Sequence, residues 1–562
     1  MPPFMPGITG VAASEAAARL IAMERDLYPA PGLRRRSASV GPDFACALHS
    51  RRDTAGIAER GGACLAFDGY VTNLPQRGAD LPEALLDGFL ARGPGFLEGL
   101  DGSFQIMVHH EGTTWLFADP TGSRRLFYVH GDQCFAFSPE VAPLVDFQDG
   151  GIDPANLVQF LVSGRFFAGR TLLAEIRQLL PGESVSRRGG RLERRRHFRY
   201  EVASLPGGPD AAAALGNVLE RAVLQAWEQA PSPFLSLSGG YDSRTIFHLL
   251  TRKLGSGCGL RTALWGQRMD VPGCDNRAAE EVARRAGLCH LVLPWRTEVL
   301  PEQLEEMFLA QSGMTEMIFT HSDELAVFRG LAEEHACRTV LRADEPFGPK
   351  GGEVEDVQTA LRAVSMSRTE QVAEVDRWLA GGGRDWREAH AAALEDLLAE
   401  LPSGPSELRD TLYVRERLPA LLHHHNYHKL HFVEMMNPFL HLDVLRFWSA
   451  LPPEHRVGKR LVLDFYHEHI GDHREVPIAT LDNGADWTGA LRRSPELAAW
   501  VRERLERLPE PLDRGHFLGK LEAVVRGEEE PSAPPGFHRV PAVKQIARAV
   551  VLGRWLETWA RV

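Results

Sequence analysis

The segment Ser236–Arg244, which reads Ser-Leu-Ser-Gly-Gly-Tyr-Asp-Ser-Arg, constrains this chain more than any other feature. A short apolar run, Pro233–Leu235, precedes it, and a mostly apolar stretch, Thr245–Leu250, follows it. This order predicts a strand, a tight glycine turn and the start of a helix. Such a turn directs backbone N–H groups and a helix N-terminus at an anion, and serine hydroxyls add donors. Phosphate is the anion that suits this geometry.

The turn differs from two common phosphate-binding patterns, because it lacks the Gly-Lys-Ser/Thr end of the Walker loop and is not Gly-x-Gly-x-x-Gly. Asp242 is negatively charged, so it helps to bind phosphate only if a Mg²⁺ lies between its carboxylate and the phosphates. The alternative is a Ser/Gly turn that merely leads into a helix. The predicted phosphate-binding residues are Ser236, Ser238, Gly239, Gly240, Asp242 and Ser243.

The composition excludes several classes of protein. The chain has 562 residues, enough for two to four domains, and a formal net charge of −12, which argues against a nucleic-acid binder with a broad basic surface. Its seven cysteines form no C-x-x-C pair, so we expect no disulfide framework or zinc site and a reducing, cytoplasmic location. No apolar run is long enough to span a membrane, and no secretory signal is evident.

The pattern of the chain changes at about residue 200. Residues 1–200 contain short β-like runs separated by glycines, which predicts an α+β unit of stacked antiparallel sheets. Residues 201–211 read as a linker. Residues 212–562 begin with alternating helical and strand patterns, which predict an α/β parallel sheet with ligands at the carboxyl ends of its strands. Beyond about residue 355 the pattern is mainly helical.

The glycine turn resembles the Ser-Gly-Gly-x-Asp-Ser loop of the ATP pyrophosphatases, which split ATP into AMP and pyrophosphate to adenylate a substrate. Further segments resemble the asparagine synthetase family: Met5–Gly10, Phe67–Asn73, Leu100–Phe104, Ala118–Tyr128 and Leu179–Glu183. That family joins a glutaminase-type domain, here 1–200, to an ATP pyrophosphatase domain, here 212–562. The resemblance implies ATP binding by the turn and a need for Mg²⁺.

The departures from the family concern the glutaminase half. Glutamine-using members attack glutamine with an N-terminal cysteine, but Pro6 stands at the matching position and has no thiol. Asp68 and Tyr70 replace the Asn and Glu that would hold glutamine. We therefore expect this domain to be an inactive scaffold. Members that lack the cysteine include β-lactam synthetases and the macrolactam cyclases of lasso peptides.

The synthetase half supplies the other candidate site residues. Arg342–Gly348 resembles the family's Gly-Ala-Asp-Glu-x-Phe-Gly, which implies that Asp344 and Asp242 share the Mg²⁺. A gap-free alignment instead matches Asp344 to the acidic residue before this motif, and a helix or turn cap is the non-catalytic alternative. Glu434 takes the place of a family acid that helps to deprotonate the attacking amine. It is either a base or a structural ion-pair partner.

A cation is needed to stabilise the transition state and the departing pyrophosphate. The segment that matches the family's lysine, Arg474–Gly484, contains no lysine. Lys459 is the candidate because it begins a stretch that resembles another family segment, although a surface lysine also fits. Arg474 and Lys350 are alternatives.

A group of histidines adds a further possibility. On a helix, His424, His428 and His431 share one face. Metal binding, lining of a substrate channel and a structural role all remain open for them.

The resemblance implies ATP-dependent amide-bond formation through an acyl-adenylate, without glutamine hydrolysis. A natural-product ligase or a macrolactam cyclase of the lasso-peptide type fits best, with a small molecule or peptide as substrate and a peptidase or precursor peptide as candidate partner. The alternative is a weakened paralogue that binds nucleotide or a partner without turnover. An enzyme acting on tRNA is disfavoured by the acidic charge, and neither a nucleic acid nor a membrane is expected as a partner.

Overall fold

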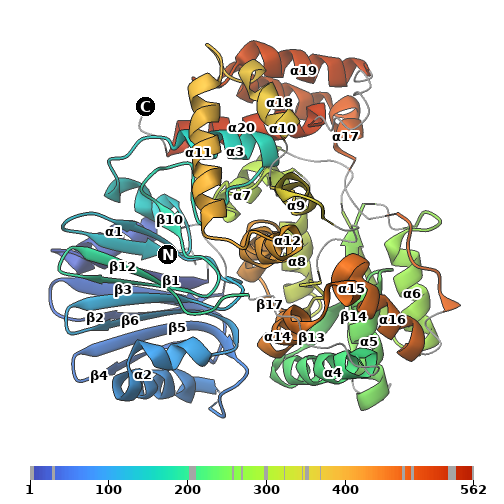
Figure 1. Ribbon diagram of the computed structural model, residues 1–562, viewed down its shortest axis with the longest axis horizontal. Helices are drawn as coiled ribbons and strands as arrows, with labels where there is room; N and C mark the ends of the chain where they lie inside the picture. The colour runs from blue at the N-terminus through green and yellow to red at the C-terminus, as the bar shows by residue number, and fades with distance from the viewer. Residues whose placement is uncertain are drawn as a thin grey trace.

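The computed structural model shows two stacked antiparallel sheets, a parallel sheet beside them and a group of helices above both (Figure 1). The description that follows covers residues 6–27, 32–76, 78–200, 211–255, 259–267, 270–295, 301–319, 321, 323–344, 346–347, 354–366, 369–470, 475–481, 486–528 and 540–559. The expected linker, apart from residue 211, lies outside these ranges.

The two antiparallel sheets each have six strands and form the N-terminal unit, as the sequence predicts. The first has the order β10 (Arg177–Gln178), β8 (Phe127–His130), β9 (Phe135–Ser138), β1 (Gly7–Ala12), β3 (Phe44–Ser50), β2 (Arg34–Ser39). The second has the order β12 (Arg191–Arg196), β11 (Glu183–Arg188), β7 (Thr113–Ala118), β6 (Gly102–His110), β5 (Ala63–Val71), β4 (Gly56–Arg60).

Strand β5 shows why the sheets stack. Every one of its residues is buried, because side chains alternate between two covered faces. Cys64 and Ala66 pack into the core between the two sheets. Leu65 and Phe67 pack on the other face, in the core that includes helix α2 (Leu81–Arg92). The continuous apolar run in the sequence therefore reflects burial on both faces.

The parallel sheet has the order β15 (His290–Pro294), β14 (Arg261–Gly266), β13 (Pro233–Ser236), β16 (Thr339–Leu341), β17 (Glu434–Met436). All four neighbouring pairs run parallel. The carboxyl ends of β13, β16 and β17 thus meet at one edge, where such sheets bind ligands. The first four strands lie in the region predicted to alternate between helix and strand, whereas β17 lies in a region predicted to be mainly helical.

Helices connect and surround this sheet. Those that follow its strands are α5 (Tyr241–Leu254), α6 (Asp275–Arg285), α7 (Pro301–Ala310), α9 (Val357–Ala363) and α14 (Leu442–Ala450). The other helices include α1 (Ala16–Arg25), α4 (Ala211–Gln229), α8 (Glu324–Glu333), α10 (Thr369–Glu374), α12 (Pro405–Leu412), α13 (His424–Tyr427), α15 (Pro453–Arg456), α16 (Arg460–His469), α17 (Trp487–Arg493), α18 (Pro495–Glu506) and α19 (Arg514–Arg526). No helix within the described ranges is long and apolar enough to cross a membrane.

Helix α3 (Pro154–Ser163) joins the N-terminal unit to the C-terminal helices. It contacts α11 (Arg384–Ala399) and α20 (Ala542–Thr558), as Figure 1 shows at the top of the molecule. Arg548 of α20 donates to the backbone carbonyls of Leu161 and Val162 at 2.8 Å. A single apolar core therefore includes residues from both ends of the chain.

A π-helix, η6 (Tyr413–His423), precedes the histidine-rich segment. Pro419 lies inside it and has no N–H to donate to the preceding turn, which favours the wider hydrogen-bonding pattern of a π-helix. Such segments often occur next to functional sites. Here the segment brings His423 and Asn426 to the edge of the sheet where the site lies.

Candidate functional site

The glycine turn lies where the sequence predicts it, between β13 and the N-terminus of α5. Ser238 and Ser243 close the turn, with their hydroxyl oxygens 2.9 Å apart, and the Gly240 N–H donates to Ser238 Oγ at 3.2 Å. Gly240 is the N-cap residue of α5, and no described side chain caps this helix end. The positive end of the α5 helix dipole therefore lies at the turn, which suits an anion.

Two other segments pack against the turn. The Gly239 N–H donates to Asp275 Oδ1 at 2.9 Å, so a carboxylate already accepts from one of the N–H groups expected to bind an anion. The Ala479 N–H donates to the Gly239 carbonyl at 3.1 Å. Ala479 belongs to the segment that matches the family's lysine loop, and the described part of it, 475–481, thus lies against the turn.

We expect Gly239→Ala to be far more harmful than Gly240→Ala. A Cβ at Gly239 would lie 2.5 Å from Ala479 Cβ, whereas the nearest atom to a Cβ at Gly240 is Ser238 Oγ at 3.4 Å. Overpacking should cost Gly239→Ala about 1–3 kcal/mol of stability and displace residues 475–481. Thermal unfolding of both variants tests this, and equal losses would contradict the described packing.

Lys459 contacts the turn. Its Nζ lies 3.5 Å from Asp242 Oδ2, although the two residues are 217 positions apart. Lys459 is buried. It has a positive φ of 59°, directly after the kink at Gly458, and α16 begins at the next residue. The surface-lysine alternative does not fit this burial. Arg474 and Lys350 lie outside the described residues.

Asp242 keeps one carboxylate oxygen without a described partner. Its Oδ1 is buried and has no hydrogen-bond partner among the described residues, so this oxygen is available to a Mg²⁺ that also binds phosphates. Asp344 differs. Arg342 holds its carboxylate with two bonds, Nη2–Oδ1 at 2.7 Å and Nε–Oδ2 at 3.1 Å, and Asn426 Nδ2 donates to Oδ2 at 3.0 Å.

These contacts lower the pKa of Asp344: burial opposes ionisation, but the charge and hydrogen bonds of Arg342 outweigh it. The carboxylate of Asp344 is therefore ionised, and the guanidinium group of Arg342 already balances its charge. Within the described ranges, no group of three or more His, Cys, Asp or Glu side chains is arranged to hold a metal. The residues present fit a Mg²⁺ at Asp242, and the metal-binding role of Asp344 stays a prediction.

Glu434 lies at the start of β17 and is held by two arginines of the N-terminal unit. Arg124 Nη2 lies 2.5 Å from Glu434 Oε1, and Arg52 Nε bonds Oε2. Burial opposes ionisation of Glu434, but the two guanidinium groups outweigh it and lower its pKa. A carboxylate with a lowered pKa is a weak base near neutral pH. The geometry thus favours the ion-pair alternative.

Arg124 extends this pairing into an ion network between the two sheet systems. Its Nη1 lies 2.6 Å from Asp68 Oδ2, and Asp68 Oδ1 accepts from Ser50 Oγ at 2.6 Å. Asp68 is one of the two residues at which the sequence departs from the glutamine-holding groups of the family that it resembles. The other, Tyr70, is buried and carries the Arg52 guanidinium 4.8 Å from its ring centroid. Both replacements therefore serve the contact with β17.

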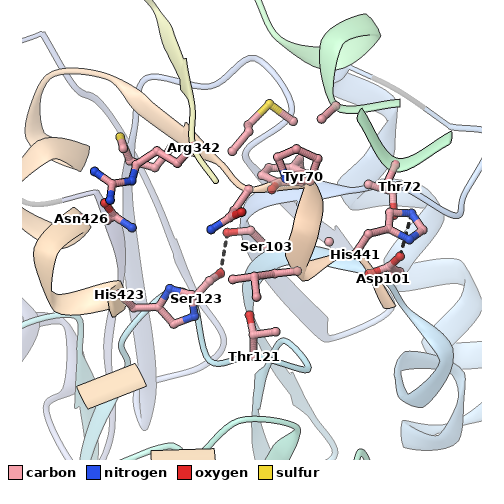
Figure 2. A pocket seen from close by; sticks show the side chains of 18 of the residues that line it. Tyr70, Thr72, Asp101, Ser103, Thr121, Ser123, Arg342, His423, Asn426 and His441 are labelled. Atoms are coloured by element: carbon pink, nitrogen blue, oxygen red, sulfur yellow. Dashed lines mark hydrogen bonds and ion pairs between the residues drawn. The ribbon is translucent and has the colours of Figure 1, made fainter. Parts of the chain in front are cut away.

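A small pocket lies next to this network, between the N-terminal unit and the carboxyl edge of the parallel sheet (Figure 2). It has a volume of about 50 Å³. Ser103 and Ser123 bond across it at 2.6 Å, and His441 Nε2 lies 3.0 Å from Asp101 Oδ2. Arg342, Asn426 and His423 line one side of it, as Figure 2 shows.

The histidines that share a helical face have separate surroundings. His428 Nε2 lies 2.6 Å from Glu324 Oε2 in a buried cluster that also contains Lys429, 3.1 Å from the same oxygen. His424 and His431 are buried, and burial lowers the pKa of each. His423, which precedes them, lines the pocket of Figure 2. The described contacts favour a structural role for His428.

Comparison with known proteins bears on the N-terminal unit. A family described as "Glutamine amidotransferase domain" matches residues 74–198. This part of the chain is a glutamine amidotransferase-like domain. The match includes strands of both sheets: β6, β7, β11 and β12 of one, and β8, β9 and β10 of the other. We therefore use the name amidotransferase-like domain for the whole two-sheet unit. The match supports the N-terminal half of the expected architecture.

Other comparisons are weak. No curated protein matches the chain. Among solved structures, the glutamine phosphoribosylpyrophosphate amidotransferase from B. subtilis, complexed with ADP and GMP, is similar at 12% identity over 51% of this chain and 90% of that chain, with a TM-score of 0.27. The U34-tRNA thiolase NcsA from Methanococcus maripaludis is similar at 12% identity over 56% of this chain and 78% of that chain, with a TM-score of 0.21. Similarities this low support no inference about function.

Proposed function

We propose that this chain is an ATP-dependent amide ligase that forms an acyl-adenylate and does not hydrolyse glutamine. The observation that carries the proposal is the meeting of the glycine turn, the carboxylate of Asp242 and the buried Lys459 at the carboxyl end of β13. This edge of a parallel sheet is where nucleotide ligands bind. Lys459 lies 217 positions from Asp242 in the sequence, so the tertiary fold brings it to the turn.

The proposed reaction has two steps. A substrate carboxylate oxygen attacks the α-phosphorus of ATP and pyrophosphate leaves; an amine nitrogen then attacks the acyl carbon and AMP leaves, while the amine loses a proton. The N-terminus of α5 and Lys459 bind the pyrophosphate group. Mg²⁺ at Asp242 would neutralise phosphate charge. The pocket of Figure 2, at about 50 Å³, is large enough only for the end of a substrate.

The amidotransferase-like domain supports the proposal that the chain does not hydrolyse glutamine. Pro6 supplies no nucleophile, and Asp68 and Tyr70 are engaged in the contacts with Arg124 and Arg52. The amine therefore comes from a substrate or from free ammonia. A natural-product ligase or macrolactam cyclase of the lasso-peptide type is the specific form that we propose, with a small molecule or a peptide as substrate.

A second candidate is a protein that binds nucleotide without turnover. The bidentate bond between Arg342 and Asp344 favours it, because a carboxylate neutralised in this way is a poorer metal ligand. The two candidates differ in whether AMP is formed.

The experiment is AMP formation from ATP and Mg²⁺ in the presence of small-molecule and peptide fractions of an extract from the source organism. We expect fraction-dependent AMP with the wild type and none with Asp242→Ala. We expect no ammonia from glutamine alone. AMP that appears only with glutamine, together with released ammonia, would refute the proposal, and absence of AMP despite nucleotide binding would favour the second candidate.

A further inference from the structure

Arginines are concentrated at one edge of the amidotransferase-like domain. Residues 187–199 contain seven arginines and one glutamate, although the whole chain has a formal net charge of −12. The segment includes all of β12, which is the last strand of its six-stranded sheet, at the end opposite β4. A strongly basic stretch of an acidic chain therefore forms the edge of a sheet.

The backbone of β12 has one open side. The N–H of His197, which follows the strand, donates to the carbonyl of Gly182 at 2.8 Å, so this residue faces β11. Backbone groups alternate in direction along an antiparallel strand, so the odd-numbered residues of β12 also face β11. The N–H and C=O groups of residues 192, 194 and 196 point the other way. No other strand in the described ranges pairs with them.

Two arginines of the strand have acidic partners. Arg191 lies 3.2 Å from Glu193, and both side chains are mostly exposed. Arg194 lies 2.7 Å from Glu183 of β11, with about half of the Arg194 side chain exposed. These pairs leave most of the positive charge of the segment unbalanced.

Three arginines of the segment have no ion pair within the part of the chain that the structure describes: Arg188 at the end of β11, Arg196 at the end of β12, and Arg199. Burial and the charge of Arg415 lower the pKa of Arg196, although nearby carboxylates oppose this. An anionic group beside these side chains would offset their mutual repulsion.

A cavity of about 370 Å³ lies beyond the end of β12. Its lining includes Arg196 and Arg199 together with the apolar side chains of Phe198, Leu401 and Val414. A strand added along β12 would run toward this cavity, which has room for a further side chain. Pockets beside an open strand edge give such binding its side-chain specificity.

The open edge and its charge select among possible occupants. A second copy of β12 would set arginines opposite arginines, which destabilises strand pairing. A nucleic acid would satisfy the arginines, but its phosphates cannot donate to the strand carbonyls, and the net charge of the chain repels it. An acidic peptide supplies both backbone groups and negative charge.

We propose that β12 is a docking edge for an extended, acidic segment of a partner protein. The segment adds a strand to the sheet through residues 192, 194 and 196, and its carboxylates bind Arg188, Arg196 and Arg199. This docking edge gives the amidotransferase-like domain a role in binding that needs no glutaminase chemistry. The proposal does not depend on the proposed ligase activity.

The test is fluorescence anisotropy of the full chain with a labelled, capped peptide, Glu-Thr-Glu-Thr-Glu-Thr, at constant ionic strength. One comparison probe replaces glutamate by lysine. A second is the acidic peptide with every backbone nitrogen methylated, which keeps its charge and removes the N–H donors that strand pairing needs. A third is a single-stranded oligothymidylate of the same length.

The variant is Arg196→Gln combined with Arg199→Gln. Its matched control, Arg284→Gln combined with Arg502→Gln, changes the net charge equally at exposed positions on α6 and α18. Thermal unfolding shows whether each variant is folded. The methylated peptide tests strand pairing on the unaltered chain.

We expect saturable binding of the acidic peptide, weakened about tenfold by loss of the two arginines and also by methylation of the peptide. The control variant should keep the affinity of the wild type, and the lysine peptide should not bind. The proposal is overturned if the acidic peptide does not saturate, if the methylated peptide binds as tightly, or if the arginine variant binds like the control. Tighter binding of the oligothymidylate than of the peptide would instead identify a surface for nucleic acid.

Discussion

Replacement of Arg124 by alanine is expected to lower the free energy of unfolding by about 3–5 kcal/mol, as is usual when one partner of a buried ion network is removed. Arg124 is 4% exposed and joins Asp68 of β5 to Glu434 of β17. Its removal leaves the Asp68 carboxylate buried without its arginine. Chemical denaturation at neutral pH measures the loss.

The matched control is Arg34→Ala, because Arg34 pairs with Asp53 on the surface, with half of the Arg34 side chain exposed. Exposed pairs contribute about 0–1 kcal/mol. The network also predicts a pH dependence, since the pKa of Glu434 is lowered on folding. Its contribution is present above the ordinary carboxyl pKa and is lost as the pH falls through the folded value. A loss from Arg124→Ala no larger than that from Arg34→Ala would contradict the network.

Replacement of Lys459 by alanine is expected to slow pyrophosphate release by about 10²–10³-fold, the loss typical of a charge-stabilising donor. Lys459 is buried beside Asp242, and in the proposed reaction it would balance the charge that develops on the departing pyrophosphate. Lys459→Arg should retain more of the rate than Lys459→Ala, because it keeps the positive charge. Steady-state rates of pyrophosphate release measure both.

The matched control for Lys459 is Lys253→Ala, because Lys253 lies in the last turn of the same helix that begins at the glycine turn. It pairs with Glu220 on the surface, with 43% of its side chain exposed. We expect its rate to match that of the wild type. A Lys459→Ala enzyme that kept most of its activity would show that Lys459 only balances the charge of Asp242.

Most of the fold could be predicted from local sequence patterns. Strand β13, the glycine turn and helix α5 follow one another in the sequence, so their order and chemistry could be predicted together. Strand β17 could not, because it has three residues and exists through its pairing with β16. A strand this short shows no alternation in the sequence.

The surroundings of the site residues were harder to predict. Arg52 and Arg124 lie 382 and 310 positions from Glu434, so no local pattern could indicate that the acid is ion-paired. Arg342 lies only two residues before Asp344, a spacing that offered a signal for their bond. The resemblance made Lys459 a candidate, but its contact with Asp242 accompanies the packing of α16 against α5, which no local pattern could indicate.

The most direct test of the central claim is exchange of labelled pyrophosphate into ATP, because it reports reversible adenylation even without an amine. The wild type and Asp242→Ala would be compared with Mg²⁺ and the small-molecule and peptide fractions of the source organism. We predict fraction-dependent label in ATP for the wild type and none for the variant. Absence of exchange with every fraction, while the wild type still binds Mg²⁺-ATP, would contradict adenylation and support a nucleotide-binding role without turnover.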